Sequence, residues 1–363
     1  MSSAASNPAL RISNRGPPEI SVGNLGEEAK KQFLRSAFSR YVPPAVVDGI
    51  VADPSQLALG GDKKMLTVLF SDIRGFTTFS ERLDAKQLVG FLNHYLGQMT
   101  DIVFAHRGTL DKYIGDAVVA FWGAPVGQDD HAVRAINAAI AMQQAVAAMR
   151  QAAQESWGID LHVGIGLTSG VVNVGNMGSP TNFEYTVIGD RVNLASRLES
   201  LTKTYGALFL TTDDTLAEIA RAGQPLPPHR VVDLVRVKGK HLAVTLGTVQ
   251  VWLGQFVLAW WVASSVLDSR LAAPCSTKVT ELFLDRSLVE VLVAPPDPAH
   301  SAGFEAARAQ YLAREFAQAQ AAFNQLYTSH GQKLYQLYAA RCDHWQTVQP
   351  AADWSGEWDM ESK

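Results

Sequence analysis

Two aspartates stand out because each lies at a turn of the chain beside apolar runs. Asp72 ends the run 65–71, and Asp116 lies in the turn between the runs 110–114 and 117–122. Neighbouring strands lie about 5 Å apart, so pairing of these elements brings both carboxylates to one edge of a sheet. Two hard oxygen ligands with open positions suit Mg²⁺, and two such ions can clamp a phosphoryl displacement. Either aspartate taken alone is more typical of simple turn capping.

The residues after Asp72 form a candidate phosphate cradle. Gly75, Phe76 and Thr77 lie between the strand and the next helix, and such a turn exposes backbone N–H groups that bind phosphate. The pattern GxxxxGK[ST] occurs nowhere in the chain, so this is not a P-loop.

A third candidate group is the pair Asn193 and Arg197. Their i, i+4 spacing places them on one helix face, where an amide and a guanidinium can orient a ribose and hold a phosphate. Taken alone, the pair is more typical of a solvated surface. The neighbouring Glu199 is expected to be a surface residue only.

The elements that must position these residues follow a β-α-β-β-α-β order, with further strands after it. One expected helix begins after Asp84 and carries apolar residues at three- and four-residue steps from Leu88 to Val103. This order predicts an α+β fold, with a ferredoxin-like antiparallel sheet covered by helices, and a small helical appendage at the C-terminal end.

Composition narrows the class of protein. The 363 residues are 47% hydrophobic and 18% charged, with a formal net charge of −4. This is a globular composition, and its acidity argues against general nucleic-acid binding. Cys275 and Cys342 are the only cysteines, which excludes a disulfide framework and a zinc spacing and fits a reducing cytoplasm. The N-terminus lacks the pattern of a signal peptide, so we expect a cytoplasmic protein.

Three segments together resemble the class III nucleotide cyclases: Phe70–Glu81, Lys112–Pro125 and Gly170–Ser200. Their order and spacing are similar to those of the family over about Met65 to Val251. The resemblance implies an adenylate cyclase of the bacterial, threonine-containing subgroup. Such an enzyme converts ATP to 3′,5′-cyclic AMP and pyrophosphate through attack of the ribose 3′-hydroxyl on the α-phosphate. The implied cofactors are two Mg²⁺ or Mn²⁺ ions.

The resemblance also implies roles for metal- and base-binding residues. Asp72 and Asp116 match the two metal-binding aspartates, and Ile73 adds its backbone carbonyl. Lys112 matches the lysine that reads adenine, where guanylate cyclases carry glutamate. Thr186 matches its partner in the purine pocket.

The remaining implied roles concern the sugar and the phosphates. Asn193 matches the residue that orients the ribose, and Arg197 matches the transition-state arginine. Lys238, with Lys240 as the alternative, matches the lysine that holds the terminal phosphates. The family forms its sites between two domains, so one cyclase domain per chain implies a homodimer with shared active sites, the aspartates coming from one protomer.

The chain divides into five expected parts. These are a disordered N-terminus (1–26), a helical connector (27–60), the catalytic domain (61–251), an unassigned apolar segment and linker (252–299), and a helical tail (300–363) that resembles tetratricopeptide repeats and is expected to bind a protein partner. Residues 242–267 carry no charge, which leaves open either a buried strand followed by an apolar helix or a membrane association.

Two other functions compete with adenylate cyclase activity. A catalytically inactive cyclase-like domain would serve as a regulatory or scaffold module, although each motif position carries a competent residue type. Guanylate cyclase activity is opposed by Lys112.

Overall fold

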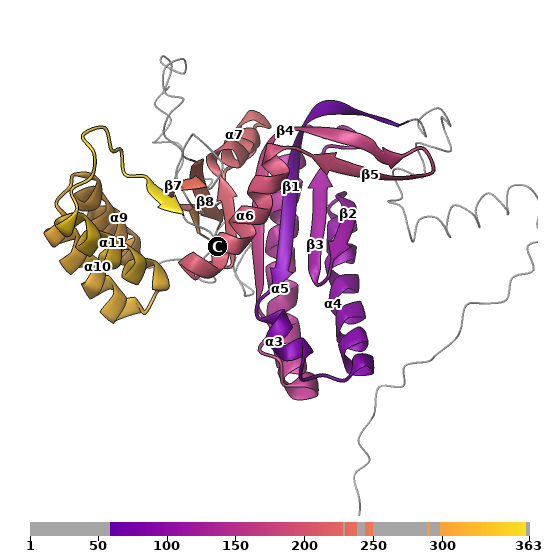
Figure 1. The fold of residues 1–363 in the computed structure, drawn as a ribbon, viewed down its shortest axis with the longest axis horizontal. Helices are drawn as coiled ribbons and strands as arrows, with labels where there is room; N and C mark the ends of the chain where they lie inside the picture. Colours follow the sequence, from indigo (N-terminus) through magenta and orange to yellow (C-terminus); the bar gives the residue numbers. More distant parts are fainter. Residues whose placement is uncertain (1–58, 228, 238–243, 250–288, 291–297, 361–363) are drawn as a thin grey trace, which may run out of the picture.

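The computed structural model describes residues 59–227, 229–237, 244–249, 289–290 and 298–360. Its strands are β1 (Gly60–Ile73), β2 (Thr109–Ile114), β3 (Ala117–Trp122), β4 (Val163–Ser179), β5 (Asn182–Ile188), β6 (Phe209–Thr212), β7 (His229–Val237), β8 (Val244–Val249), β9 (Val289–Glu290) and β10 (Trp358–Met360). Its helices are α3 (Phe76–Ser80), α4 (Ala85–Ala105), α5 (His131–Trp157), α6 (Asp190–Tyr205), α7 (Asp213–Arg221), α9 (Pro298–Leu312), α10 (Phe316–His330) and α11 (Lys333–Thr347). Figure 1 shows α9, α10 and α11 gathered at one end of the sheet, away from β2 and α4.

The described strands form one sheet in the order β10-β7-β8-β6-β4-β1-β3-β2, with β5 paired to β4. Its β4-β1-β3-β2 portion is antiparallel throughout, and with α4 and α5 it gives the predicted β-α-β-β-α-β order, which confirms the α+β fold. The sheet as a whole is mixed rather than antiparallel, because β6 runs parallel to β4 and β10 runs parallel to β7. Parallel neighbours need a long crossover connection, and α6 supplies one between β4 and β6.

Helix α4 forms where the sequence predicts it. The Asp84 carboxylate accepts a hydrogen bond from the Gln87 N–H at 2.8 Å, and the Gln87 side chain accepts one from the Asp84 N–H at 3.2 Å. This capping box satisfies two N–H groups that the first turn leaves without helical partners. The helix buries Phe91, Tyr95 and Met99 in the core between the sheet, α4 and α5.

Helix α6 lies unusually close to β4 because two residues of that strand lack side chains. An ideal Cβ at Gly166 would lie 2.2 Å from the Ala195 carbonyl oxygen, and one at Gly164 would lie 2.5 Å from Thr202 Oγ1. Only glycine permits this approach. The helix that carries Asn193 and Arg197 is therefore seated directly on the strand backbone.

The three C-terminal helices pack against the sheet domain instead of standing apart from it. Their aromatic core, which includes Phe304 and Tyr338, is continuous with Tyr205 of α6 and Val232 of β7. Strand β10 follows the helices and pairs with β7 from Val235 to Val237. The sequence predicts the helices but not this added strand.

Several predicted parts lie outside the described residues. They include the segments 1–26 and 27–58, Lys238 and Lys240, and most of residues 242–267, of which 244–249 form β8. The five predicted boundaries therefore stay predictions. In the part of the chain that the structure describes, no helix is both long and apolar enough to cross a membrane.

Candidate active site

The carboxylates of Asp72 and Asp116 come together at one end of the sheet. Ser71 pairs with Val118 across β1 and β3, so the next residue of β1 lies beside the β2–β3 turn. The Ile73 N–H donates to Asp116 Oδ2 at 3.1 Å. Burial, followed by the hydrogen bond and negative charge of Asp72, raises the pKa of Asp116 to about 7. The two carboxyl groups thus face each other, as the sequence predicts.

The chemistry of this donor set fits a divalent cation. Two facing carboxylates repel each other, and a bound cation relieves that repulsion while it favours their ionised forms. Among the described residues, no group of three or more His, Cys, Asp or Glu side chains is placed to hold a metal. Two carboxylates with an adjacent backbone carbonyl leave coordination positions for water and phosphate, which is the arrangement that Mg²⁺ prefers.

Glu199 is a third carboxylate near this pair, and the expectation that it is only a surface residue is wrong. An ideal Cβ on Gly164, which pairs with Asp72 across β1 and β4, would lie 2.8 Å from Glu199 Oε1. Burial, and then the charge of Asp72, raises the pKa of Glu199 to about 7. Glu199 lies four residues after Ala195 and three residues before Thr202, and both of these residues are buried. This helical spacing is the sequence signal that places Glu199 on the sheet-facing side of α6.

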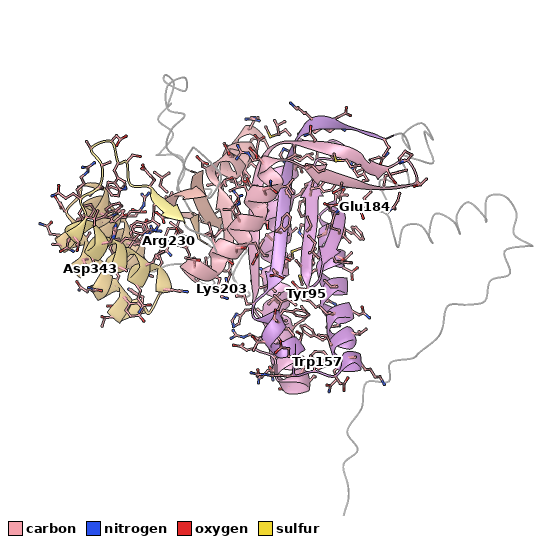
Figure 2. All side chains as sticks on the ribbon, in the orientation of Figure 1. Tyr95, Trp157, Glu184, Lys203, Arg230 and Asp343 are labelled. Atoms are coloured by element: carbon pink, nitrogen blue, oxygen red, sulfur yellow. The ribbon has the colours of Figure 1, made fainter. Side chains whose placement is uncertain are left out.

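Lys112 and Thr186 meet through two acidic residues, although 74 positions separate them in the sequence. The Thr186 hydroxyl donates to Asp111 Oδ2 at 3.0 Å. Lys112 Nζ lies 2.5 Å from Glu184 Oε2 and 3.9 Å from Asp111 Oδ1. Figure 2 labels Glu184 on the β4–β5 arm, at the opposite end of the molecule from Asp343 of the tail. Strands β2 and β5 therefore bring both predicted base-reading residues into one polar cluster.

Sequence reasoning missed Asp111, which holds this cluster together. Its side chain is 4% exposed, and burial raises its pKa to about 6, against the opposing effects of Thr186 and Lys112. The residue is therefore mostly ionised at neutral pH and accepts a hydrogen bond from the Thr186 hydroxyl. Asp111 directly precedes Lys112, which could have indicated a role in the same site. However, side chains alternate along a strand, so the sequence predicts that these two neighbours lie on opposite faces of the sheet. A register irregularity between Leu110 and Lys112 accompanies their common approach to β5.

The remaining predicted residues are placed as follows. On α6, Asn193 is exposed and Arg197 is half-buried. Gly75 adopts a left-handed conformation (φ 70°) directly before α3, which suits a glycine. The Phe76 ring packs edge-to-face on Phe79, with centroids 5.1 Å apart, so this residue can offer only its backbone to a phosphate. Thr77 is exposed.

A comparison with known protein families matches the part of the chain that carries these residues. A profile of the adenylate and guanylate cyclase catalytic domain matches residues 61–241, about half of the chain. The chain belongs to the class III nucleotide cyclases. This family assignment confirms the resemblance seen in the sequence, while the threonine-containing subgroup stays a prediction.

Two curated relatives of this chain carry a named activity. Adenylate cyclase 1 of Rhizobium meliloti is 30% identical over 209 residues, which make up 58% of this chain and 31% of that protein. The adenylate cyclase of Anabaena cylindrica is 34% identical over 216 residues, or 58% of this chain and 42% of that protein. The chain therefore spans less than half the length of either relative.

One solved structure resembles this chain in its fold. The structure of a bacterial light-regulated adenylyl cyclase is 27% identical to this chain, with a TM-score of 0.52 over 60% of this chain and 61% of that chain.

Proposed function

We propose that this cyclase converts ATP to 3′,5′-cyclic AMP and pyrophosphate. The observation that carries the proposal is the meeting of Asp72 and Asp116 at one sheet end in a chain whose Lys112 and Thr186 share a second polar cluster. The two curated relatives described above are named adenylate cyclases, which supports the choice of ATP.

The carboxylates would hold two Mg²⁺ or Mn²⁺ ions together with the Ile73 carbonyl. Bound there, such ions lower the pKa of the ribose 3′-hydroxyl and neutralise phosphate charge. The Asn193 amide orients the ribose, and the Arg197 guanidinium donates to phosphate oxygens as their negative charge grows. Removing one such contact typically costs 10²–10³ in rate, or roughly 3–4 kcal/mol. The backbone of 75–77 and Lys238 or Lys240 contact the terminal phosphates.

Asp111 explains how the cluster selects adenine. Its carboxylate accepts the hydrogen bond that the Thr186 hydroxyl donates, so the lone pairs of that hydroxyl are left to accept a hydrogen bond from a ligand. Adenine presents an amino group at C6, which donates, whereas guanine presents a carbonyl there. Lys112 can donate to a ring nitrogen of adenine. Guanine would leave the buried Thr186 hydroxyl facing another acceptor, which is a costly mismatch.

The proposed enzyme is a homodimer with two-fold symmetry and shared sites. One protomer supplies Asp72 and Asp116, while its partner supplies the adenine-reading cluster and α6. This division follows from the family's two-domain sites and from the single cyclase domain in this chain.

Product formation by the purified full chain tests the proposal. ATP or GTP is supplied with Mg²⁺ or Mn²⁺, and cyclic products are separated by chromatography. We expect cyclic AMP from ATP, little cyclic GMP, and no product from a folded Asp72→Asn variant. Cyclic GMP as the main product would make the chain a guanylate cyclase. No product from a folded dimer would favour a regulatory module.

A further inference from the structure

A buried ion pair joins the helical tail to the cyclase domain. Asp233 of β7 and Arg341 of α11 contact each other through Oδ2 and Nη1, and each side chain is 1% exposed. Arg341 Nη2 donates to the Tyr205 hydroxyl at 3.0 Å, and that hydroxyl donates to Asp233 Oδ2 at 2.5 Å. The Tyr338 hydroxyl lies 2.7 Å from the Val232 carbonyl oxygen. We call Asp233, Arg341 and Tyr205 the clamp.

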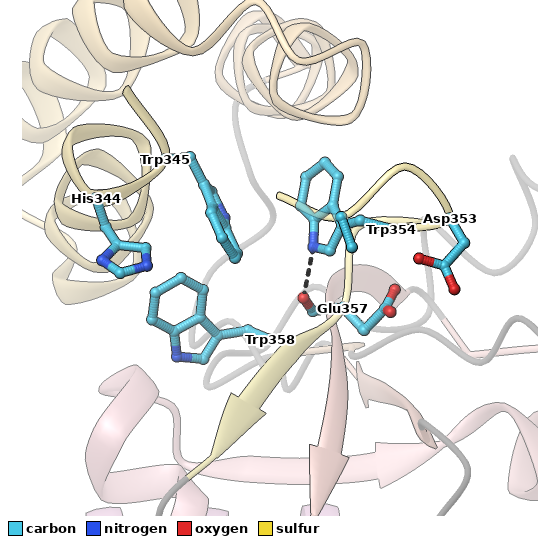
Figure 3. A pocket seen from close by; sticks show the side chains of 7 residues that line it. His344, Trp345, Asp353, Trp354, Glu357 and Trp358 are labelled. Carbon is cyan, nitrogen blue, oxygen red and sulfur yellow. Dashed lines mark hydrogen bonds between the residues drawn. The ribbon is translucent and has the colours of Figure 1, made fainter. Parts of the chain in front are cut away.

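The clamp is enclosed by aromatic rings from the tail. The guanidinium carbon of Arg341 lies 4.9 Å from the ring centroid of Trp358 on β10 and 5.3 Å from that of Tyr338. Trp358 also lines a cavity of about 470 Å³ with Trp345, Trp354 and Glu357 (Figure 3). Breaking a buried pair on one side leaves an uncompensated charge and is strongly destabilising. The cation that pairs with Asp233 is Arg341, which lies in the helical tail and outside residues 61–241.

The clamp touches the ends of two elements that the proposed mechanism uses. Tyr205 is the last residue of α6, and Arg197 lies about two turns before it on the same helix. Asp233 is on β7, which ends at Val237, directly before the predicted phosphate-binding Lys238. Because α6 is seated on Gly164 and Gly166 of β4, it cannot shift at one end without moving along its length.

We propose that Arg341 is a positioning residue of the cyclase: by contacting both Asp233 and Tyr205, which are hydrogen-bonded to each other, it holds α6 against β7 and so sets the place of Asn193 and Arg197. This inference rests on the proposed function. It makes the tail a part of the catalytic unit and not only a separate binding module. The two nitrogens of the guanidinium are what the role requires, because one faces Asp233 and the other Tyr205.

Two conservative variants separate positioning from folding. Arg341→Lys keeps the charge beside Asp233 but replaces the planar fork of two nitrogens by one ammonium, so the arrangement with one nitrogen on Asp233 and the other on Tyr205 is lost. Tyr205→Phe removes the hydroxyl and keeps the ring. We expect each to lower kcat by about three- to thirtyfold, with KM for ATP within about twofold of the wild-type value, because a misplaced α6 weakens contacts made in the transition state. The double variant should lose no more than the worse single one, because both variants remove the contact between Arg341 and Tyr205.

Arg314→Lys is the matched control within the tail. Arg314 donates to the carbonyls of Ala351 and Ala352 and lies 5.7 Å from the Trp354 ring centroid, so it supports the tail without touching α6 or β7. We expect its kcat to be that of the wild type. An equal loss of kcat in this control would overturn the inference, because the tail would then act in general and not through the clamp.

Hydrogen exchange on the full chain tests positioning without any nucleotide. We expect faster exchange in the last turn of α6 and in β7 for Tyr205→Phe and Arg341→Lys, but not for Arg314→Lys. Wild-type exchange together with wild-type kcat in a folded Tyr205→Phe protein would overturn the inference. If the wild type makes no cyclic nucleotide, the proposed function fails, and the exchange rates alone then decide whether Arg341 positions α6.

Discussion

The contact between α6 and β4 can be tested with a single methyl group at Gly166. An ideal Cβ there would lie 2.2 Å from the Ala195 carbonyl oxygen and 2.2 Å from the Glu199 nitrogen. Non-bonded heavy atoms settle at roughly 3.5 Å or more, so a Gly166→Ala variant must push the helix away by about 1 Å. Both obstacles are backbone atoms, which no side-chain rotation can relieve.

This displacement has two expected costs. Overpacking a well-filled interior typically costs 1–3 kcal/mol of unfolding free energy, and the backbone obstacles place Gly166→Ala near the upper end, at about 3 kcal/mol. The helix also carries Asn193 and Arg197, and a misplacement of about 1 Å can lower a rate by up to about 10²-fold. We expect kcat to fall by about 10- to 100-fold while the protein remains folded.

Urea unfolding and steady-state kinetics measure the two effects on one preparation. Gly90→Ala is the control, because Gly90 lies within α4 and a Cβ there meets no atom within 4 Å. It should stabilise the protein by up to about 1 kcal/mol through helix propensity and leave kcat unchanged. A Gly166→Ala protein with the unfolding midpoint and kcat of the wild type would refute the close seating of α6.

Three further perturbations address the adenine cluster and the carboxylates. Burial raises the pKa of Asp111 from 3.8 to about 6, so the protonated form, which stabilises the folded state, is lost as the pH rises through 6. The free energy of unfolding of Asp111→Asn, measured with urea, should therefore exceed that of the wild type by up to about 3 kcal/mol at pH 8 and equal it near pH 3. Lys112→Glu places like charges beside Glu184 and should lower kcat/KM for ATP at least tenfold relative to GTP; an unchanged ratio would contradict the base-reading role. Chelation should abolish product formation, Mg²⁺ should restore it, and the circular dichroism spectrum should stay constant; activity that persists without metal would contradict the carboxylate assignment.

The sequence predicts those parts of the site that depend on local pattern. Gly115 and Asp116 between two apolar runs indicate a hairpin, and the hairpin forms between β2 and β3. The capping box at Asp84 and the apolar spacing of α4 are likewise local signals, and both are present. Local periodicity is sufficient here because each element buries one face against a neighbouring layer.

The sequence does not predict contacts that depend on tertiary placement. Asp233 and Arg341 are 108 positions apart, and no local pattern indicates that a helix of the tail supplies a cation to β7. Strand β10 has only three residues, and its pairing with β7 depends on where three preceding helices bring the chain. The sequence indicates a surface residue at Glu199, because the glycines of β4 that allow its approach to Asp72 are distant in the sequence.

In the proposed homodimer, the carboxylates and the α6 residues act on one ATP from two different protomers. The most direct measurement mixes an Asp72→Ala protein with an Arg197→Ala protein and follows cyclic AMP formation. Each protein alone should be inactive, and the mixture should regain activity, because a heterodimer contains one site with both groups intact. Heterodimers that form, as shown by differential tagging, but make no cyclic AMP would contradict the account.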